Sequence, residues 1–259
     1  MASPVEAERA LPLIDQHPDT DSFRDDVLDG LTQERKSIPS KYLYDQRGSE
    51  LFDAICEMDT YYLTRTEMAI MRVHIDDMAA AVGPRARIVE YGSGSSLKTR
   101  ILLDALDEVA AYVPIDISRD HLVSTANDLA SDYPHIPVQP VCADYTTEFE
   151  LPDPPPSAER TVVYYPGSTI GNFVPERALA FLRHVGEIAG PGGGLLIGVD
   201  LRKDPDILIP AYDDPEGITA EFNHNLLDRI NREIGATFDP ERFDYEAVWN
   251  ETRSCIDMQ

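Results

Sequence analysis

The sequence predicts an α/β fold built on a doubly wound, mostly parallel sheet. Apolar, strand-like runs alternate with helix-like segments between residues 87 and 201, and a Gly-X-Gly turn follows the first run. Polar residues gather where several of these runs end. Such alternation is typical of right-handed crossovers between parallel strands, and ligands bind beyond the carboxyl ends of these strands.

The positions of the elements follow from the hydrophobic pattern. The predicted strands are residues 87–91, 112–117, 138–143, 161–166 and 194–201, and the predicted helices between them are residues 96–109, 118–131 and 175–189. Outside this region, helices are predicted at residues 21–31, 49–58 and 213–233, and a strand-like segment begins at 243–250. Thr64 and Glu67 have the spacing of a capping box and predict a further helix to about residue 82. The first twenty residues are expected to be loose.

Residues 88–100, IVEYGSGSSLKTR, predict a nucleotide-type cofactor site. Its glycines allow the backbone to approach a ligand, and Asp116, 22 residues after Gly94, is placed to bind ribose hydroxyls. The third glycine of a dinucleotide fingerprint is replaced by Leu97, and Glu90 would repel a phosphate but suit a sulfonium. The motif therefore favours S-adenosylmethionine. A dinucleotide site and a purely structural glycine turn are the alternatives.

Composition excludes several partners and sites. The chain has 47 acidic and 22 basic residues and a formal net charge of -25, which argues against binding nucleic acid or an anionic membrane. A dispersed acidic surface with only four lysines is typical of proteins that stay soluble in high salt. The three scattered cysteines, the absence of metal-ligand spacing and the polar N-terminus predict a cytoplasmic protein without a metal site.

Four motifs together resemble the histidine-specific N-alpha-methyltransferases of ergothioneine biosynthesis. They are residues 61–67 (YYLTRTE), the glycine loop, residues 167–172 (GSTIGN) and residues 211–225 (AYDDPEGITAEFNHN). The resemblance runs from about residue 21 to the C-terminus. It implies a class I, Rossmann-like, S-adenosylmethionine-dependent methyltransferase core at residues 66–201. It also implies a mainly helical substrate-binding lobe, formed by residues 1–65 and 202–259. The implied reaction converts L-histidine into its trimethylated betaine, hercynine.

The resemblance also implies roles for individual residues. The cofactor-binding set that it implies is Tyr44, Gly92, Ser93, Gly94, Lys98, Asp116, Asp144, Tyr145 and Gly167. Tyr61 is expected near the substrate amine as the catalytic residue, and Asn172 and Tyr212 are expected to hold the substrate carboxylate.

Several of these residues have simpler interpretations. Asp116 and Asp144 could be solvated or capping carboxylates, and Asn172 follows a glycine in a common turn pair. One of Tyr61 and Tyr62 is expected to pack while the other faces the cleft. Asp213 and Asp214 are expected to cap a helix rather than to catalyse.

The family continues for some tens of residues beyond the point where this sequence stops, so the chain is expected to be truncated. The missing part would contain the residues that recognise the imidazole, and other amino acids or amines therefore remain alternative substrates. A nicotinamide-dependent oxidoreductase and an inactive binding fragment are the alternatives from other classes. Truncation would also leave residues 194–201 as an exposed apolar strand edge through which the chain could self-associate.

Overall fold

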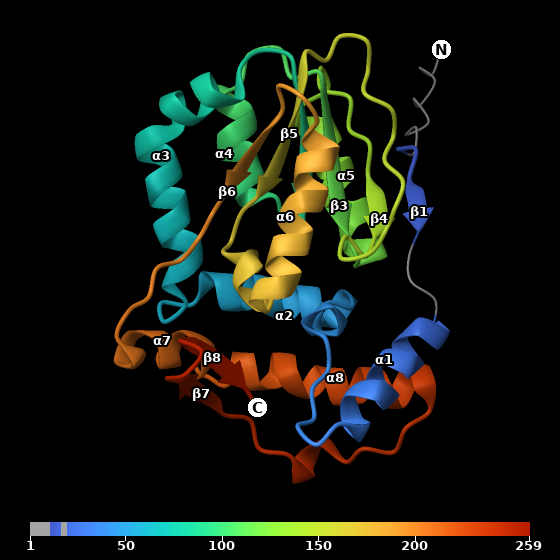
Figure 1. The fold of residues 1–259 in the computed structure, drawn as a ribbon, viewed down its shortest axis with the longest axis vertical. Coiled ribbons are helices and arrows are strands. Elements are labelled where there is room, and N and C mark those ends of the chain that lie inside the picture. Colours follow the sequence, from blue (N-terminus) through green and yellow to red (C-terminus); the bar gives the residue numbers. More distant parts are fainter. Residues whose placement is uncertain (1–10, 17–19) are drawn as a thin grey trace, which may run out of the picture.

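The computed structural model describes residues 11–16 and 20–259. Its six-stranded sheet has the order β1-β4-β3-β2-β5-β6, and all neighbouring strands are parallel (Figure 1). The strands are β1 (Ile14–Gln16), β2 (Ala86–Tyr91), β3 (Ala111–Asp116), β4 (Val141–Ala143), β5 (Arg160–Tyr165) and β6 (Gly194–Ile197). The order reverses at β2, because β3 and β4 lie on one side of it and β5 and β6 on the other. The predicted doubly wound sheet is confirmed, and its switch point lies at β2.

Helices cover both faces of this sheet. They are α3 (Tyr62–Val82), α4 (Leu97–Ala105) and α5 (Arg119–Asp132) on one face and α6 (Pro175–Ala189) on the other (Figure 1). Successive strand residues point to opposite faces, so Ile88 packs with Leu102 and Leu129 while Val89 packs with Phe181. This double coverage explains why β2 and β3 are buried along their whole length. None of the described helices is long and apolar enough to cross a bilayer.

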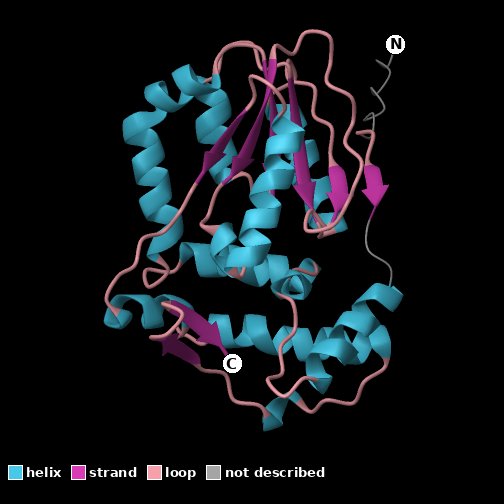
Figure 2. Ribbon diagram, in the orientation of Figure 1, coloured by secondary structure: helices cyan, strands magenta, loops and turns pink. Residues whose placement is uncertain are grey.

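A mainly helical layer, here called the lobe, crosses the carboxyl end of the sheet (Figures 1 and 2). It contains α1 (Thr20–Thr32), η1 (Ser40–Leu43), α2 (Gln46–Glu57), α7 (Pro205–Tyr212), α8 (Ile218–Ile234), η3 (Pro240–Arg242) and the antiparallel hairpin of β7 (Ala247–Asn250) and β8 (Cys255–Met258). Leu51 of α2, Ala211 of α7 and Phe222 of α8 share one apolar cluster with Tyr61. The lobe is therefore assembled from two parts of the chain that are far apart in sequence. The predicted domain boundaries near residues 65 and 201 stay a prediction.

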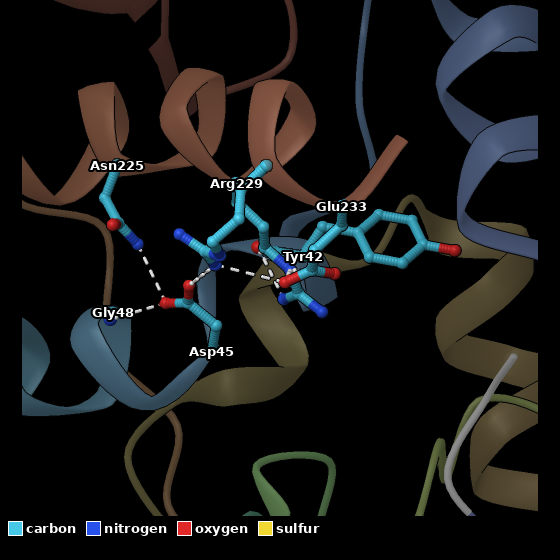
Figure 3. A network of polar contacts seen from close by, with 7 residues as sticks. Tyr42, Asp45, Gly48, Asn225, Arg229 and Glu233 are labelled. Atoms are coloured by element: carbon cyan, nitrogen blue, oxygen red, sulfur yellow. Dashed lines mark hydrogen bonds and ion pairs between the residues drawn. The ribbon is translucent and has the colours of Figure 1, made fainter. Parts of the chain in front are cut away.

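Residues 40–45, here called the strap, are fixed to α8 by a polar network (Figure 3). The guanidinium of Arg229 donates a 3.0 Å hydrogen bond to the carbonyl of Tyr42 and stacks over the Tyr42 ring. Asp45 caps α2 and also accepts a 2.8 Å hydrogen bond from Asn225. This network ties the strap to both α8 and α2.

The predicted elements around the sheet are confirmed, with shifts at their ends. The predicted helices at residues 21–31 and 49–58 are likewise found, as α1 and α2. β4 begins only at Val141, because Val138 forms no more than an isolated bridge to Tyr112. β6 ends at Ile197, four residues before the predicted end at Leu201.

The predicted capping box is wrong. α3 begins at Tyr62, so Thr64 lies inside the first helical turn. Glu67 instead accepts hydrogen bonds from Lys98 and from the backbone of Gly167. The carboxylate thus serves a tertiary contact and not the local helix start.

The helix predicted at residues 213–233 is confirmed as α8, which begins five residues later, at Ile218, whereas α7, which ends at Tyr212, was not predicted. Gly217 between them has a φ of +77°, which a continuous helix does not allow. Asp214 accepts hydrogen bonds from the backbone N–H groups of Ile218 (2.9 Å) and Thr219 (2.7 Å). Its predicted capping role is confirmed.

The expectation of a loose N-terminus is wrong for residues 14–16, which form β1 beside β4. Arg119 anchors this short strand through a 2.7 Å ion pair with Asp15. Residues 1–10 and 17–19, to which the same expectation applied, lie outside the described residues.

Replacing Arg229 by methionine is expected to lower the free energy of unfolding by about 2–3 kcal/mol, because a charged hydrogen bond is lost in a buried position. Urea unfolding of the purified protein measures the change. Arg232→Met is the matched control, since its side chain is 54% exposed and its ion pair with Asp45 should contribute less than about 1 kcal/mol. Equal effects of the two variants would contradict the proposed role of the network.

Candidate active site

The glycine loop joins β2 to α4 at the carboxyl end of the sheet. Gly92 and Gly94 have φ values of +71° and +46°, which explains why glycine is needed at both positions. The N–H groups of Gly92 and Ser93 donate to the carbonyl of Ile115 at distances of 2.8 and 3.2 Å. The loop is therefore fixed to the end of β3.

Asp116 ends β3 directly beside this loop. One carboxylate oxygen accepts a 3.3 Å hydrogen bond from the N–H of Gly94, and the other accepts a 2.9 Å bond from the N–H of Ser118. The side chain is buried, and burial raises the pKa of its carboxyl group. The structure thus brings Gly94 and Asp116 together, as a ribose site requires, although the ribose-binding role itself stays a prediction.

Asp144 and Tyr145 follow β4 at the same carboxyl end of the sheet. The ring of Tyr145 stacks on Tyr91 with centroids 5.3 Å apart and passes beside Gly92. Asp144 accepts hydrogen bonds from the N–H of Thr146 (2.9 Å) and from the ammonium of Lys41 (2.9 Å). The pair with Lys41 connects the strap to Asp144, a member of the predicted cofactor-binding set.

Sequence reasoning missed Lys41. The ammonium of Lys41 also lies 3.0 Å from Asp26 of α1, so one cation joins two carboxylates from different layers. Burial alone would lower the pKa of Lys41, but the hydrogen bonds that its ammonium donates to the two carboxylates raise the pKa above its usual value. The chain has 22 basic and 47 acidic residues, and only four of the basic residues are lysines. This scarcity was the one sequence signal that could have singled out Lys41.

The polar atoms around the glycine loop fit an adenosine-type donor. The hydroxyl of Ser93 is buried and has no hydrogen-bond partner among the described residues. A side chain at Gly92 would require the strained φ of +71° and would face the ring of Tyr145. An unpaired buried hydroxyl beside a loop without side chains is what a bound polar ligand would complete.

Lys98 lies on the first turn of α4, and its ammonium is 2.7 Å from a carboxylate oxygen of Glu67. A side chain at Gly167 would begin 3.2 Å from this ammonium, so the two predicted cofactor contacts are neighbours. Glu67 was missed as a site residue because the sequence pattern assigned it to a local cap.

The three tyrosines expected at the site come together in the lobe. Tyr61 and Tyr212 meet edge to face with centroids 6.0 Å apart, and Tyr44 reaches Tyr61 through the ring of Phe52. No hydrogen bond of these three hydroxyls is found within the described residues. Burial raises the pKa of Tyr212 to about 12 and that of Tyr61 well above its usual value. These phenols therefore stay neutral and can donate or accept hydrogen bonds.

Tyr61 and Tyr62 make different contacts. Tyr62 donates its hydroxyl hydrogen to Asp200, on the segment that leads from β6 to α7, whereas Tyr61 belongs to the aromatic cluster. Asn172 ends the short helix η2 (Thr169–Asn172) after β5 and is exposed. Its side chain makes no hydrogen bond within the part of the chain that the structure describes. Asn172 thus lies at the carboxyl end of the sheet without contacting the tyrosines.

Glu90 lies beneath the glycine loop and not in an open crevice. Its carboxyl group accepts hydrogen bonds from Thr99 and Tyr112, both at 2.6 Å. Full burial raises the pKa of Glu90 to about 7. Among the described residues, no group of three or more histidine, cysteine, aspartate or glutamate side chains could hold a metal ion.

Comparisons with known proteins agree with this geometry. The family model for histidine-specific, SAM-dependent methyltransferases matches residues 23–259. The histidine N-alpha-methyltransferase of Mycolicibacterium smegmatis is 42% identical over 241 residues, which cover 92% of this chain and 74% of that protein. The enzyme of the same name from Mycobacterium tuberculosis is 42% identical over 240 residues, with the same coverage. Ergothioneine biosynthesis protein 1 of Neurospora crassa is 35% identical over 206 residues, which cover 78% of this chain and 23% of that protein.

Glu90→Gln is expected to change how stability depends on pH. In the ligand-free protein, Glu90 keeps its proton up to a pH of about 7, whereas the unfolded chain loses it near 4.5. The folded state then binds more protons in this window, so its stability falls as the pH rises through it, by up to about 3 kcal/mol. The difference in unfolding free energy between wild type and variant, measured by urea unfolding from pH 4 to 8, should follow this curve. A constant difference across the window would contradict it.

Proposed function

Because the chain belongs to the family of histidine-specific, SAM-dependent methyltransferases, we propose that it methylates the α-amine of L-histidine. Three successive transfers from S-adenosylmethionine would give the trimethylated betaine hercynine, the reaction of ergothioneine biosynthesis. The observation that carries the proposal is the position of the predicted cofactor-binding residues relative to the predicted substrate-binding residues. The glycine loop with Asp116 lies at the end of the sheet that the lobe crosses, and in this lobe the hydroxyls of Tyr44, Tyr61 and Tyr212 make no hydrogen bond within the described residues.

The substrate is thus a small molecule, and the tyrosines and Asn172 would bind it. Asn172 and Tyr212 would hold the carboxylate through hydrogen bonds, and the hydroxyl of Tyr61 would orient the amine lone pair and relay its proton. Because the pKa of Tyr61 is raised by burial, the phenol would act as a neutral relay and not as a phenolate base. A location in the cytoplasm is part of the same proposal, since three scattered free cysteines suit a reducing compartment.

Catalysis would depend mainly on positioning. S-adenosylmethionine supplies, when bound, an electrophilic sulfonium methyl group. The residues of the chain would hold the neutral amine in line with it, which can contribute about 7–11 kcal/mol. No covalent link to the protein is required, so a nucleophile activated by a base is not needed.

Incubation with S-adenosylmethionine and a mixture of amino acids, followed by mass spectrometry, tests the reaction. Histidine carrying one, two and three methyl groups is the expected product. Methylation of tryptophan, tyrosine or another amine would overturn the choice of substrate. A thermal shift with NAD but none with S-adenosylmethionine would favour an oxidoreductase instead.

Asn172→Ala is expected to lower kcat/KM for histidine about 10- to 100-fold, because hydrogen bonds to charged groups contribute about 1.5–3 kcal/mol. The affinity for S-adenosylmethionine, measured by calorimetry, should not change. Glu176→Gln, at the exposed start of α6, is the control and should alter neither value. Unchanged kcat/KM in Asn172→Ala would show that this amide does not anchor the substrate.

We further propose that the chain self-associates through β6. Within the described residues β6 pairs only with β5, and Leu195, Val199 and Leu201 on this edge segment are 36%, 60% and 76% exposed. An unpaired apolar edge favours pairing with the same edge of a second copy. The finding that supports this proposal is the combination of open backbone and apolar side chains.

Sedimentation velocity over a range of concentrations tests self-association. Leu195→Lys places a charge on the edge and should shift the protein towards the monomer. Leu28→Lys is the matched control, because Leu28 is 54% exposed on α1, away from β6. A monomeric wild type, or equal shifts in both variants, would overturn the proposal.

A further inference from the structure

We propose that Glu67 is a positioning residue that couples the donor site to the acceptor site. It would act through Lys98 on the donor side and through the turn at Gly167 on the acceptor side. The inference rests on the proposed function and assigns a role to a residue outside the predicted site.

The first observation is the pair of Glu67 and Lys98. Its oxygen and nitrogen are 2.7 Å apart, and each side chain is 18% exposed, so water screens the pair only in part. Lys98 lies in the first turn of α4, where the positive end of the helix dipole disfavours a cation. Glu67 therefore supplies the negative charge that keeps the ammonium of Lys98 beside the glycine loop.

The second observation is the turn that follows β5. The N–H of Gly167 donates to both carboxylate oxygens of Glu67, at 2.8 and 3.1 Å. Gly167 has a φ of +82°, and the turn that it opens leads through η2 to Asn172. The carboxylate thus fixes the start of the segment that presents the proposed carboxylate anchor.

The third observation is the close approach of the chain after β6. A side chain at Gly198 would begin 1.9 Å from a carboxylate oxygen of Glu67, so a larger residue there would displace this carboxylate. Gly198 also donates a 3.0 Å hydrogen bond to the carbonyl of Tyr165. The carboxylate is held between α3, α4, the β5 turn and the end of β6, and it cannot move without moving its neighbours.

These contacts give Glu67 two separable effects. Loss of its charge would release the ammonium of Lys98, which is predicted to contact the donor. Loss of one acceptor oxygen would loosen the turn at Gly167 and so displace Asn172. A residue that only stabilises the fold would change neither binding constant in protein that remains folded.

The test uses Glu67→Gln, Lys98→Met and the double variant. Calorimetry gives the Kd for S-adenosylmethionine, and steady-state kinetics give the KM for histidine. Lys98→Met should raise only the donor Kd, by about tenfold, which corresponds to one lost interaction of about 1.4 kcal/mol. Glu67→Gln should raise both the donor Kd and the KM by similar factors.

The double variant decides whether the two residues act together. Its donor Kd should be no higher than that of Lys98→Met, because the effect of Glu67 on the donor passes through Lys98. Its KM should stay as high as in Glu67→Gln. Additive changes in the donor Kd, or a KM that Glu67→Gln leaves unchanged, would overturn the proposal.

Asp132→Asn is the matched control, because it weakens the ion pair of Asp132 with Arg100. Arg100 lies on α4, the helix that also carries Lys98. The Asp132→Asn variant should change neither constant. Circular dichroism and thermal unfolding accompany each variant, and a Glu67→Gln protein that only melts earlier, with both constants unchanged, would also refute the coupling. A wild type that binds no S-adenosylmethionine would instead overturn the proposed function.

Discussion

The candidate site depends on the parallel pairing of β2 with both β3 and β5. In this register Val89 lies between Val113 and Val163, so the three strands end together at one edge. From β2 the chain continues through α4 to β3 on one side of β2, and it later reaches β5 and β6 on the other side. The loops after these strands diverge, and the space between them is where a ligand can approach backbone N–H groups. The glycine loop, Asp116 and the Gly167 turn owe their proximity to this one constraint.

A second feature is the compensation of charge at this edge. Asp116 and Asp144 are buried in a protein with a formal net charge of -25, and each accepts hydrogen bonds that offset the loss of water. Lys41 and Lys98, two of the four lysines, each pair with carboxylates there. Since a sulfonium donor carries a positive charge, a site that retains several carboxylates suits it better than it would suit a pyrophosphate.

The sequence was sufficient for those parts of the molecule that are encoded locally. The central strands are buried on both faces, so their apolar runs stand out, and the loop with Gly92 and Gly94 follows from the backbone that it must adopt. The start of α8 was placed five residues too early, because Asp214 caps the helix from outside it and Gly217 has a positive φ just before it.

Lys41 and Glu67 were missed for a different reason. Their partners lie 103 and 31 residues away in the sequence, and no local period reports a contact of that kind. The same limit applies to β1, whose three residues are recognisable as a strand only beside β4. Pairing over long separations is decided by the tertiary fold, and single-sequence patterns contain little information about it.

The two-part construction of the lobe has a consequence for how the protein acquires its fold. Asp45 meets Asn225 and Arg232 across separations of 180 and 187 residues, so the strap gains its support only when α8 is available. Closing so long a loop costs entropy before any contact compensates for it. During synthesis, α1 and the strap would leave the ribosome early, and all six strands of the sheet would be made before α8, on which α1 and the strap rely, becomes available. Docking of α8 is then a late step in folding, and the site at the sheet edge is completed with it.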